Sequence, residues 1–144
     1  MIENGQIHRS QIVMAARRHL GTRFQHQARK EGVAIDCVGL LVLVARELGV
    51  PHLDSRRYSR FPDGKALVDH LHYSCDRLPT IAHARAGSVL VFEFLGPDWP
   101  QHVGIRTDRG MIHTSATVGK VVEHPYDEWW IARTFAALDF RGVV

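Results

Sequence analysis

The feature that most constrains the fold is an apolar segment running from Cys37 to Leu48. Asp36 stands directly before it, and a carboxylate at this position is typical of a helix N-cap. Gly49 follows the segment and Pro51 comes two residues later, as is usual where a helix ends. A helix that is apolar on nearly every side must be buried. The sequence therefore predicts a central helix around which the rest of the chain packs.

The length of 144 residues fits one ordinary domain. Hydrophobic residues make up 45% of the chain and charged residues 23%. This balance is typical of a globular protein and excludes fibrous and disordered classes. We therefore expect residues 1–144 to form a single domain with one core and one site.

Helical patterns come first along the chain and strand patterns follow. Helices are predicted over Ser10–Leu20 and Lys65–Tyr73, with a polar loop, Thr22–Ile35, ahead of the central helix. This order predicts an α+β domain with the central helix packed on an antiparallel β-sheet. The expected strands are Ser88–Leu95, His102–Arg106, Met111–Ser115, Lys120–Glu123 and Thr134–Phe140.

The charge and hydropathy of the chain indicate which classes of partner and which locations to expect. The net charge of +3 would suit an anionic partner, but the basic residues are scattered, which favours a solvated surface and no nucleic-acid partner. No apolar run reaches the ~20 residues of a membrane span, and Met1–Gly5 lacks the features of a secretory signal. We expect a protein that is cytoplasmic as synthesised and reaches any outside target through a virion, cell lysis or a secretion apparatus.

Cys37 is the first candidate for chemistry. An Asp36 cap would place it in the first turn of the central helix, where the helix dipole favours a thiolate. The alternative is that Cys37 is a small buried apolar residue. Cys37 and Cys75 are the two cysteines of the chain, and we expect both to be free thiols, with Cys75 in a structural role.

Two histidines flank the predicted turn Thr107–Gly110. If the two central residues of this turn form its tip, His102 falls opposite Ser115 and His113 opposite Gly104. Both imidazoles then project from one face of the hairpin as diagonal neighbours. A three-residue loop would send them to opposite faces instead.

The favourable register would let His102 take the thiol proton of Cys37 while His113 orients its imidazole. A zinc site is the alternative, because one cysteine and two histidines form a known ligand set. The short ligand spacings typical of zinc sites are absent, so we expect no metal. Trp99, Trp129 and Trp130 are interpreted as packing residues or groove walls.

Three segments carry a family resemblance. Asp36–Leu40 reads Asp-Cys-Val-Gly-Leu, His102–Ile105 reads His-Val-Gly-Ile, and Met111–Thr114 reads Met-Ile-His-Thr. Together with Gly87–Phe92, they resemble the motifs of the NlpC/P60 family of papain-like cell-wall peptidases, in the same order. Val38 replaces a serine of the family motif. The resemblance covers the chain from about Ser10 to Phe140.

The resemblance implies a papain-like fold in which Cys37 is the nucleophile, His102 the base and His113 the third, polar residue. It implies hydrolysis of an amide bond in peptidoglycan stem peptides through an acyl-enzyme, with no cofactor. The family analogy favours a bond next to D-glutamate and a diamino acid. We therefore expect a peptidoglycan peptide as the substrate.

The segment upstream of Asp36 departs from the common family pattern. Gly21–Gln27 resembles a subgroup encoded by prophages and associated with phage tails, with Phe24 where many relatives have a tyrosine near the cysteine. Phe24, His26 and Asp36 are the expected supporting residues. The subgroup implies phage tail proteins as partners and a location in the virion, the periplasm or the cell wall.

Two other functions remain open at this point. One is a different thiol amidase or acyltransferase activity on the same fold, with a small or lipid substrate, which a broad apolar groove would favour. The other is a phage tail assembly protein with weak or lost catalysis, which a sealed or unreactive Cys37 would favour.

Overall fold

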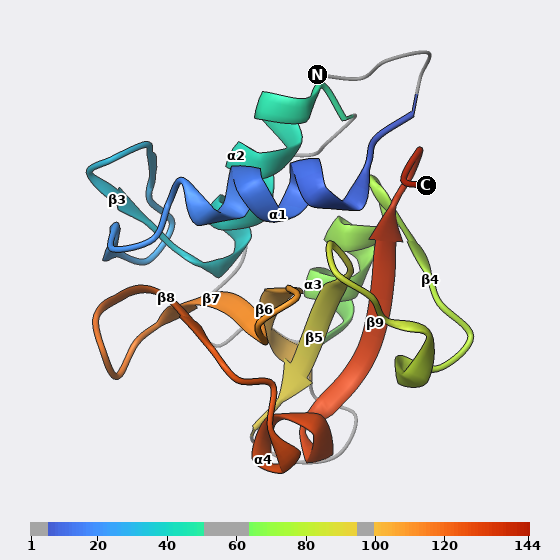
Figure 1. The fold of residues 1–144 in the computed structure, drawn as a ribbon. Coiled ribbons are helices and arrows are strands. Elements are labelled where there is room, and N and C mark those ends of the chain that lie inside the picture. The colour runs from blue at the N-terminus through green and yellow to red at the C-terminus, as the bar shows by residue number, and fades with distance from the viewer. Residues whose placement is uncertain (1–5, 51–63, 95–99) are drawn as a thin grey trace.

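The computed structural model describes residues 6–50, 64–94 and 100–144, which fold into helices packed on a curled sheet (Figure 1). The helices are α1 (Arg9–Arg17), α2 (Cys37–Leu48), α3 (Gly64–His72), the 3₁₀ turn η1 (Ile81–His83) and α4 (Glu128–Ala132). The strands are β1 (Arg23–Phe24), β2 (Arg29–Lys30), β3 (Ala34–Ile35), β4 (Cys75–Arg77), β5 (Val89–Glu93), β6 (Pro100–Arg106), β7 (Met111–Ser115), β8 (Lys120–His124) and β9 (Thr134–Phe140).

The strands of the described residues join in one sheet, in the order β2-β3-β1-β8-β7-β6-β5-β9-β4. The pairings are antiparallel except for the short parallel contact of β1 with β3. The consecutive hairpins β5-β6, β6-β7 and β7-β8 form the centre of the sheet. The predicted α+β architecture with an antiparallel sheet is therefore confirmed.

Helix α2 begins and ends where the sequence predicts. The side chain of Asp36 accepts a hydrogen bond from the backbone N–H of Gly39, at 2.7 Å. Gly49 ends the helix in the left-handed conformation, at φ +70°, which a residue without Cβ adopts at little cost. Pro51 lies outside the described residues. Most of the helix is buried, as its apolar sequence requires.

The sheet separates two groups of apolar side chains. On one side, Leu40 and Val44 of α2 belong to the main core together with Val91, Val103 and Ile112 of the central strands. A smaller cluster, Leu90, Phe92, Met111 and Ala137, packs with Trp130 on the other side. Because successive residues of β5 alternate between the two clusters, this strand is apolar throughout.

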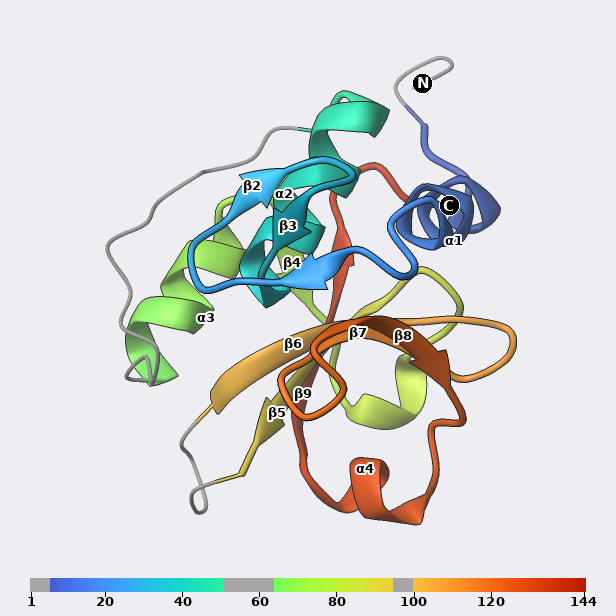
Figure 2. The ribbon, with the colours of Figure 1, turned by 90° about the vertical axis from the view of Figure 1, so that its left-hand side faces the viewer.

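The chain forms two halves that meet at the start of α2. Figure 2 shows α1, α2, α3 and the short strands β2 and β3 above β6, β7, β8 and α4, while β9 runs upward behind α2. Helix α2 contacts β6 and β7 across this boundary. The first residue of α2 therefore faces the middle strands of the sheet.

The structure corrects the prediction at several elements. The expected loop Thr22–Ile35 contains three strands, β1, β2 and β3, each two residues long and so too short to show an alternating pattern. Helix α1 is shorter than the expected Ser10–Leu20. Strand β4 and helix α4 were not predicted; β4 is an edge strand paired only with β9 among the described residues.

Among the described residues, no helix is both long and apolar enough to span a membrane.

Candidate active site

A buried ion pair fixes the start of α2, where Cys37 is the first helical residue. One carboxylate oxygen of Asp36 accepts hydrogen bonds from the guanidinium of Arg29 and from the backbone N–H of Gly39, both at 2.7 Å. The other oxygen accepts from the backbone N–H of Gln27 at 2.7 Å. Both side chains of the Arg29–Asp36 pair are only 3% exposed. The loop before the helix and the first turn of the helix are thus one hydrogen-bonded unit.

Gly39 is required by the close approach of this loop. A Cβ atom at position 39 would lie 2.6 Å from the carbonyl oxygen of Ala28 and 3.1 Å from the Arg29 guanidinium. A side chain here would push the loop away from the helix. The glycine of the Asp-Cys-Val-Gly-Leu motif therefore lets the loop around Ala28 pack directly against the first turn of α2, which contains Cys37.

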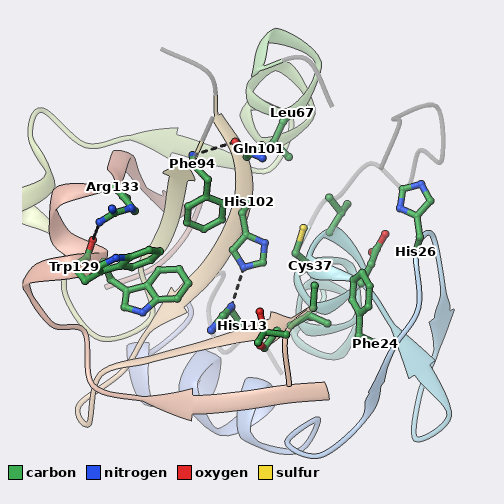
Figure 3. A pocket seen from close by; sticks show the side chains of 17 residues that line it. Phe24, His26, Cys37, Leu67, Phe94, Gln101, His102, His113, Trp129 and Arg133 are labelled. Carbon is green, nitrogen blue, oxygen red and sulfur yellow. Dashed lines mark hydrogen bonds between the residues drawn. The ribbon is translucent and has the colours of Figure 1, made fainter. Parts of the chain in front are cut away.

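Cys37 opens onto a pocket of about 590 Å³ between the two halves (Figure 3). Cys37 is of intermediate exposure as a residue, and it is one of the residues that line the pocket. The pocket is lined by Phe24, His26, Asp36, Cys37, Val38, Leu67, Phe94, Gln101, His102, His113, Thr114, Ser115, Ala116, Thr117, Trp129, Trp130 and Arg133. The pocket thus contains all six residues that the sequence nominated.

The two predicted histidines are bonded to one another. Gly104 pairs with His113, as the sequence predicts, and Thr107 and Gly110 bond across the turn. The Nε2 atom of His102 lies 2.8 Å from Nδ1 of His113. The predicted same-face register is therefore confirmed, with the imidazoles in contact.

His102 presents its remaining ring nitrogen to Cys37. Because Nε2 is bonded to His113, the nitrogen turned toward the Cys37 sulfur in Figure 3 is Nδ1. The backbone N–H groups of Val103 and Val38 also donate to the sulfur. This arrangement can move the thiol proton from Cys37 to His102.

The electrostatics differ from the sequence-based expectation of an ionised thiol. Burial and the nearby Asp36 carboxylate raise the pKa of Cys37 to about 12, against the opposing effect of the Val103 and Val38 N–H groups. Burial lowers the pKa of His102 to about 4, with a smaller opposing effect from Asp36. Burial and the neighbouring imidazoles lower the pKa of His113 to about 3. The resting site is therefore a neutral thiol beside neutral imidazoles, because desolvation outweighs the helix dipole.

A third histidine, which the sequence reasoning did not connect to the site, extends the array. His124 Nε2 lies 2.7 Å from His113 Nε2, and His124 Nδ1 lies 2.9 Å from the carbonyl oxygen of Pro125. The signal was available, because His113 pairs with Val122 and residue 124 therefore points to the same face. Extending the register argument to the second hairpin would have found it.

Aromatic residues form the wall of the pocket beside these histidines. The ring centroids of Trp130 lie 4.8 Å from His113 and 5.2 Å from His124. Phe94 and the half-exposed Trp129 continue this wall. The expectation of Trp129 and Trp130 as groove walls is confirmed, and Trp99 lies outside the described residues. The Arg133 guanidinium, which the sequence analysis did not single out, stacks 3.7 Å above the Trp129 ring.

The zinc alternative does not fit this geometry. His102 and His113 direct ring nitrogens at each other, so these nitrogens cannot both point at one ion. Within the described ranges 6–50, 64–94 and 100–144, no group of three or more His, Cys, Asp or Glu side chains has a metal-binding arrangement. Cys37 and Cys75 are both free thiols, and Cys75 is buried in the main core.

No protein-family model and no curated protein matches the sequence. Solved structures do match in fold. NlpC1 from Trichomonas vaginalis superposes with a TM-score of 0.69 at 14% identity, over 90% of this chain and 42% of that one. An NlpC/P60 family protein from Bacillus cereus gives 0.69 at 17% identity, over 92% and 40%. The chain thus spans about 40% of the length of these two proteins.

Two further solved structures with this fold are a single NlpC/p60 domain and a protein described as non-catalytic. The NlpC/p60 domain of the peptidoglycan hydrolase SagA superposes with a TM-score of 0.67 at 19% identity, over 93% of this chain and 100% of that one. RipD from Mycobacterium tuberculosis, described as a non-catalytic NlpC/p60 domain protein adapted to peptidoglycan binding, gives 0.61 at 14% identity, over 92% and 96%. On these superpositions, the chain has the NlpC/P60 fold.

Proposed function

We propose that this chain is a cysteine peptidase that hydrolyses amide bonds in peptidoglycan stem peptides. The observation that carries the proposal is the arrangement at the start of α2, where Cys37 opens onto a pocket and faces the free nitrogen of His102. His113 fixes the opposite nitrogen of that imidazole at 2.8 Å. A nucleophile, a base and an orienting group in this order form the minimum set for acyl transfer.

The first half of the reaction forms an acyl-enzyme. Nδ1 of His102 takes the thiol proton as the Cys37 sulfur attacks the amide carbonyl, so the two charges arise together and attract each other. Backbone N–H groups at the start of α2 stabilise the oxyanion of the tetrahedral intermediate. The His102 imidazolium then gives its proton to the leaving amine as the C–N bond breaks.

The second half releases the acyl group by hydrolysis. A water molecule attacks the thioester carbonyl and gives one proton to Nδ1 of His102. The C–S bond breaks, the carboxylic acid product leaves, and the proton returns to the Cys37 sulfur. The site ends in the neutral state in which it began, without a cofactor.

The peptidoglycan substrate is supported by the fold neighbours. SagA is described as a peptidoglycan hydrolase, and so is RipB from Mycobacterium tuberculosis. The pocket also supplies polar groups for a peptide backbone, among them Gln101 and Thr117. These observations support a peptidoglycan peptide as the substrate. The fragments released in the digestion below identify the scissile bond.

The test is digestion of purified peptidoglycan by the wild type, by Cys37→Ala and by a matched control, Cys75→Ala, which removes the other thiol. Fragments are identified by mass spectrometry. We expect cuts within stem peptides from the wild type and from Cys75→Ala, and none from Cys37→Ala, because the buried Cys75 lies outside the pocket. No wild-type cleavage by a folded protein would overturn the proposal.

A second candidate is thiol acyl transfer on an apolar substrate. The observation in its favour is the apolar and aromatic part of the pocket, in which Phe24, Leu67, Phe94, Trp129 and Trp130 line the walls. Thioesters of increasing acyl length distinguish the two candidates. A Cys37-dependent rate that rises steeply with chain length, without cleavage of peptidoglycan, would favour acyl transfer.

A non-catalytic role, as in a phage tail assembly protein, is the third candidate. RipD supplies a precedent for an NlpC/p60 domain without catalysis. The neutral thiol of Cys37 agrees with this role, whereas its exposure to the pocket favours an enzyme. Stoichiometric binding of peptidoglycan or of tail proteins, with no turnover by the wild type, would favour it.

A further inference from the structure

Three histidines form a continuous hydrogen-bonded row across the middle of the sheet. They belong to β6, β7 and β8, and each is displaced diagonally from the one before it. His102 bonds to His113 at 2.8 Å, His113 to His124 at 2.7 Å, and His124 to the carbonyl oxygen of Pro125 at 2.9 Å. We call this set, from His102 to the Pro125 carbonyl, the histidine row.

The carbonyl at the end of the row sets the direction of every bond in it. A carbonyl oxygen only accepts, so Nδ1 of His124 carries a proton and donates to Pro125. With one ring proton, on Nδ1, His124 offers Nε2 as an acceptor, and the proton between the rings then belongs to Nε2 of His113. By the same step, Nδ1 of His113 accepts from Nε2 of His102. Nδ1 of His102 is left with a lone pair.

This lone pair is the one turned toward the thiol of Cys37. We propose that His124 is a positioning residue that, through His113 and the carbonyl of Pro125, holds His102 in the tautomer that can accept the thiol proton. The proposal rests on the proposed function, since it assigns the thiol proton to His102. His124 contacts neither the thiol nor, on this assignment, the substrate.

The reversed row shows what His124 prevents. If His113 donated from Nδ1, His102 would carry its proton on Nδ1 and would face the thiol as a donor, which cannot act as a base. His113 Nε2 would then accept from His124 Nε2, and the unprotonated Nδ1 of His124 would face the Pro125 carbonyl, acceptor against acceptor. Two acceptors that face each other at 2.9 Å repel and lose the hydrogen bond between them, which favours the productive direction.

The row also needs no rearrangement during the reaction. When His102 takes the thiol proton, its Nε2–H still donates to Nδ1 of His113, and the other two bonds keep their direction. The donors and acceptors are therefore in place before charge develops, as electrostatic preorganisation requires. The ring centroid of Trp130 lies 4.8 Å from that of His113 and 5.2 Å from that of His124, so the indole packs against these two imidazoles of the row.

Two substitutions at position 124 separate hydrogen bonding from packing. His124→Phe keeps a ring but removes the acceptor for His113. His124→Gln restores an acceptor, because its side-chain carbonyl oxygen can reach the place of Nε2. We expect His124→Phe to lower kcat about tenfold, as the loss of one hydrogen bond to a buried group predicts, with KM nearly unchanged. His124→Gln should recover most of that loss.

Long-range ¹H–¹⁵N spectra of histidine-labelled protein test the assignment without any substrate. In the wild type we expect Nε2–H on His102 and His113 and Nδ1–H on His124, each peak identified by a single-histidine variant. In His124→Phe the His102 signals should shift toward a mixture of tautomers, and in His124→Gln they should stay in the wild-type form.

Three outcomes would overturn the proposal. These are Nδ1–H on His102 in the wild type, a wild-type kcat in a folded His124→Phe protein, and equal loss in the Phe and Gln variants. The tautomer spectra decide the role of His124 even if the wild type does not cleave peptidoglycan. Failure of the peptidase assay and failure of this inference are therefore distinguishable.

Discussion

At the scale of single residues, the unusual feature is that the proposed nucleophile and the proposed base are both neutral at neutral pH. Burial raises the pKa of Cys37 to about 12 and lowers that of His102 to about 4. Neither group carries a charge alone at neutral pH, so the thiolate and the imidazolium form as a pair. The proposed enzyme thus differs from a peptidase with a pre-ionised thiol, and its pH dependence is diagnostic.

We expect kcat/KM to fall as the pH falls through about 4, because His102 must be neutral to accept the thiol proton and burial holds its pKa there. The rate should be nearly constant across neutral pH. A pH–rate profile on a soluble stem peptide measures this limb. A limb near 6.5, the pKa of an exposed imidazole, would show that His102 is hydrated in the free protein.

At the scale of elements, the start of α2 depends on an ion pair between a loop and a helix cap. Arg29 and Asp36 are nearly inaccessible, and the Asp36 carboxylate is shared with two backbone N–H groups. Removing one partner of a buried pair leaves the other charge without compensation. The loop and the first helical turn should therefore loosen together when the pair is broken.

We expect Arg29→Met to lower the free energy of unfolding by about 3 kcal/mol, since it leaves the Asp36 carboxylate buried and unpaired. Urea denaturation measures the change. The matched control is Arg18→Met, whose ion pair with Glu47 is 51% and 30% exposed and should contribute less than about 1 kcal/mol. Similar losses in both variants would contradict the importance of the buried pair.

The elements that the sequence predicts best are those with a pattern and an end signal of their own. Helix α2 has an aspartate cap, an apolar run and a terminal glycine, and strand β7 follows a four-residue turn, so the bounds of both agree with prediction. Strands β1 to β3 have no such pattern, because tertiary pairing alone defines them.

The residues of the candidate site also fall into two groups, those that local sequence features predict and those that depend on tertiary structure. Cys37, His102 and His113 were found because a cap, a turn and a register are local features. Arg29 was missed because its pairing with Asp36 depends on the path of the loop. His124 was missed because its bond to His113 requires the register of a second hairpin.

At the scale of the whole molecule, the histidine row links the site to stability. His102 and His113 are held neutral in the folded protein, with pKa values of about 4 and 3. In the unfolded chain their pKa values return to about 6.5, so the unfolded state binds more protons at acid pH. Above pH 6.5 the two histidines are neutral in both states, so their burial costs no proton. As the pH falls below 6.5, protonation favours the unfolded chain and the free energy of unfolding decreases.

We therefore expect the free energy of unfolding to decrease by roughly 4 kcal/mol between pH 6.5 and 4.5, a window above the titration of paired carboxylates. Urea titrations at several pH values measure this slope. His113→Asn should flatten it, since one of the buried imidazoles is then absent. An unchanged slope in this variant would show that the acid sensitivity arises elsewhere.

The equal spacing of the three histidines carries a consequence for how this sequence can change. His102, His113 and His124 are each 11 residues apart, one hairpin per interval. Inserting or deleting one residue in either connecting turn would turn the next histidine to the opposite face of the sheet. Surface turns are usually the segments most tolerant of length variation. In this chain we expect the lengths of these two turns to be fixed by the alignment of the three histidines.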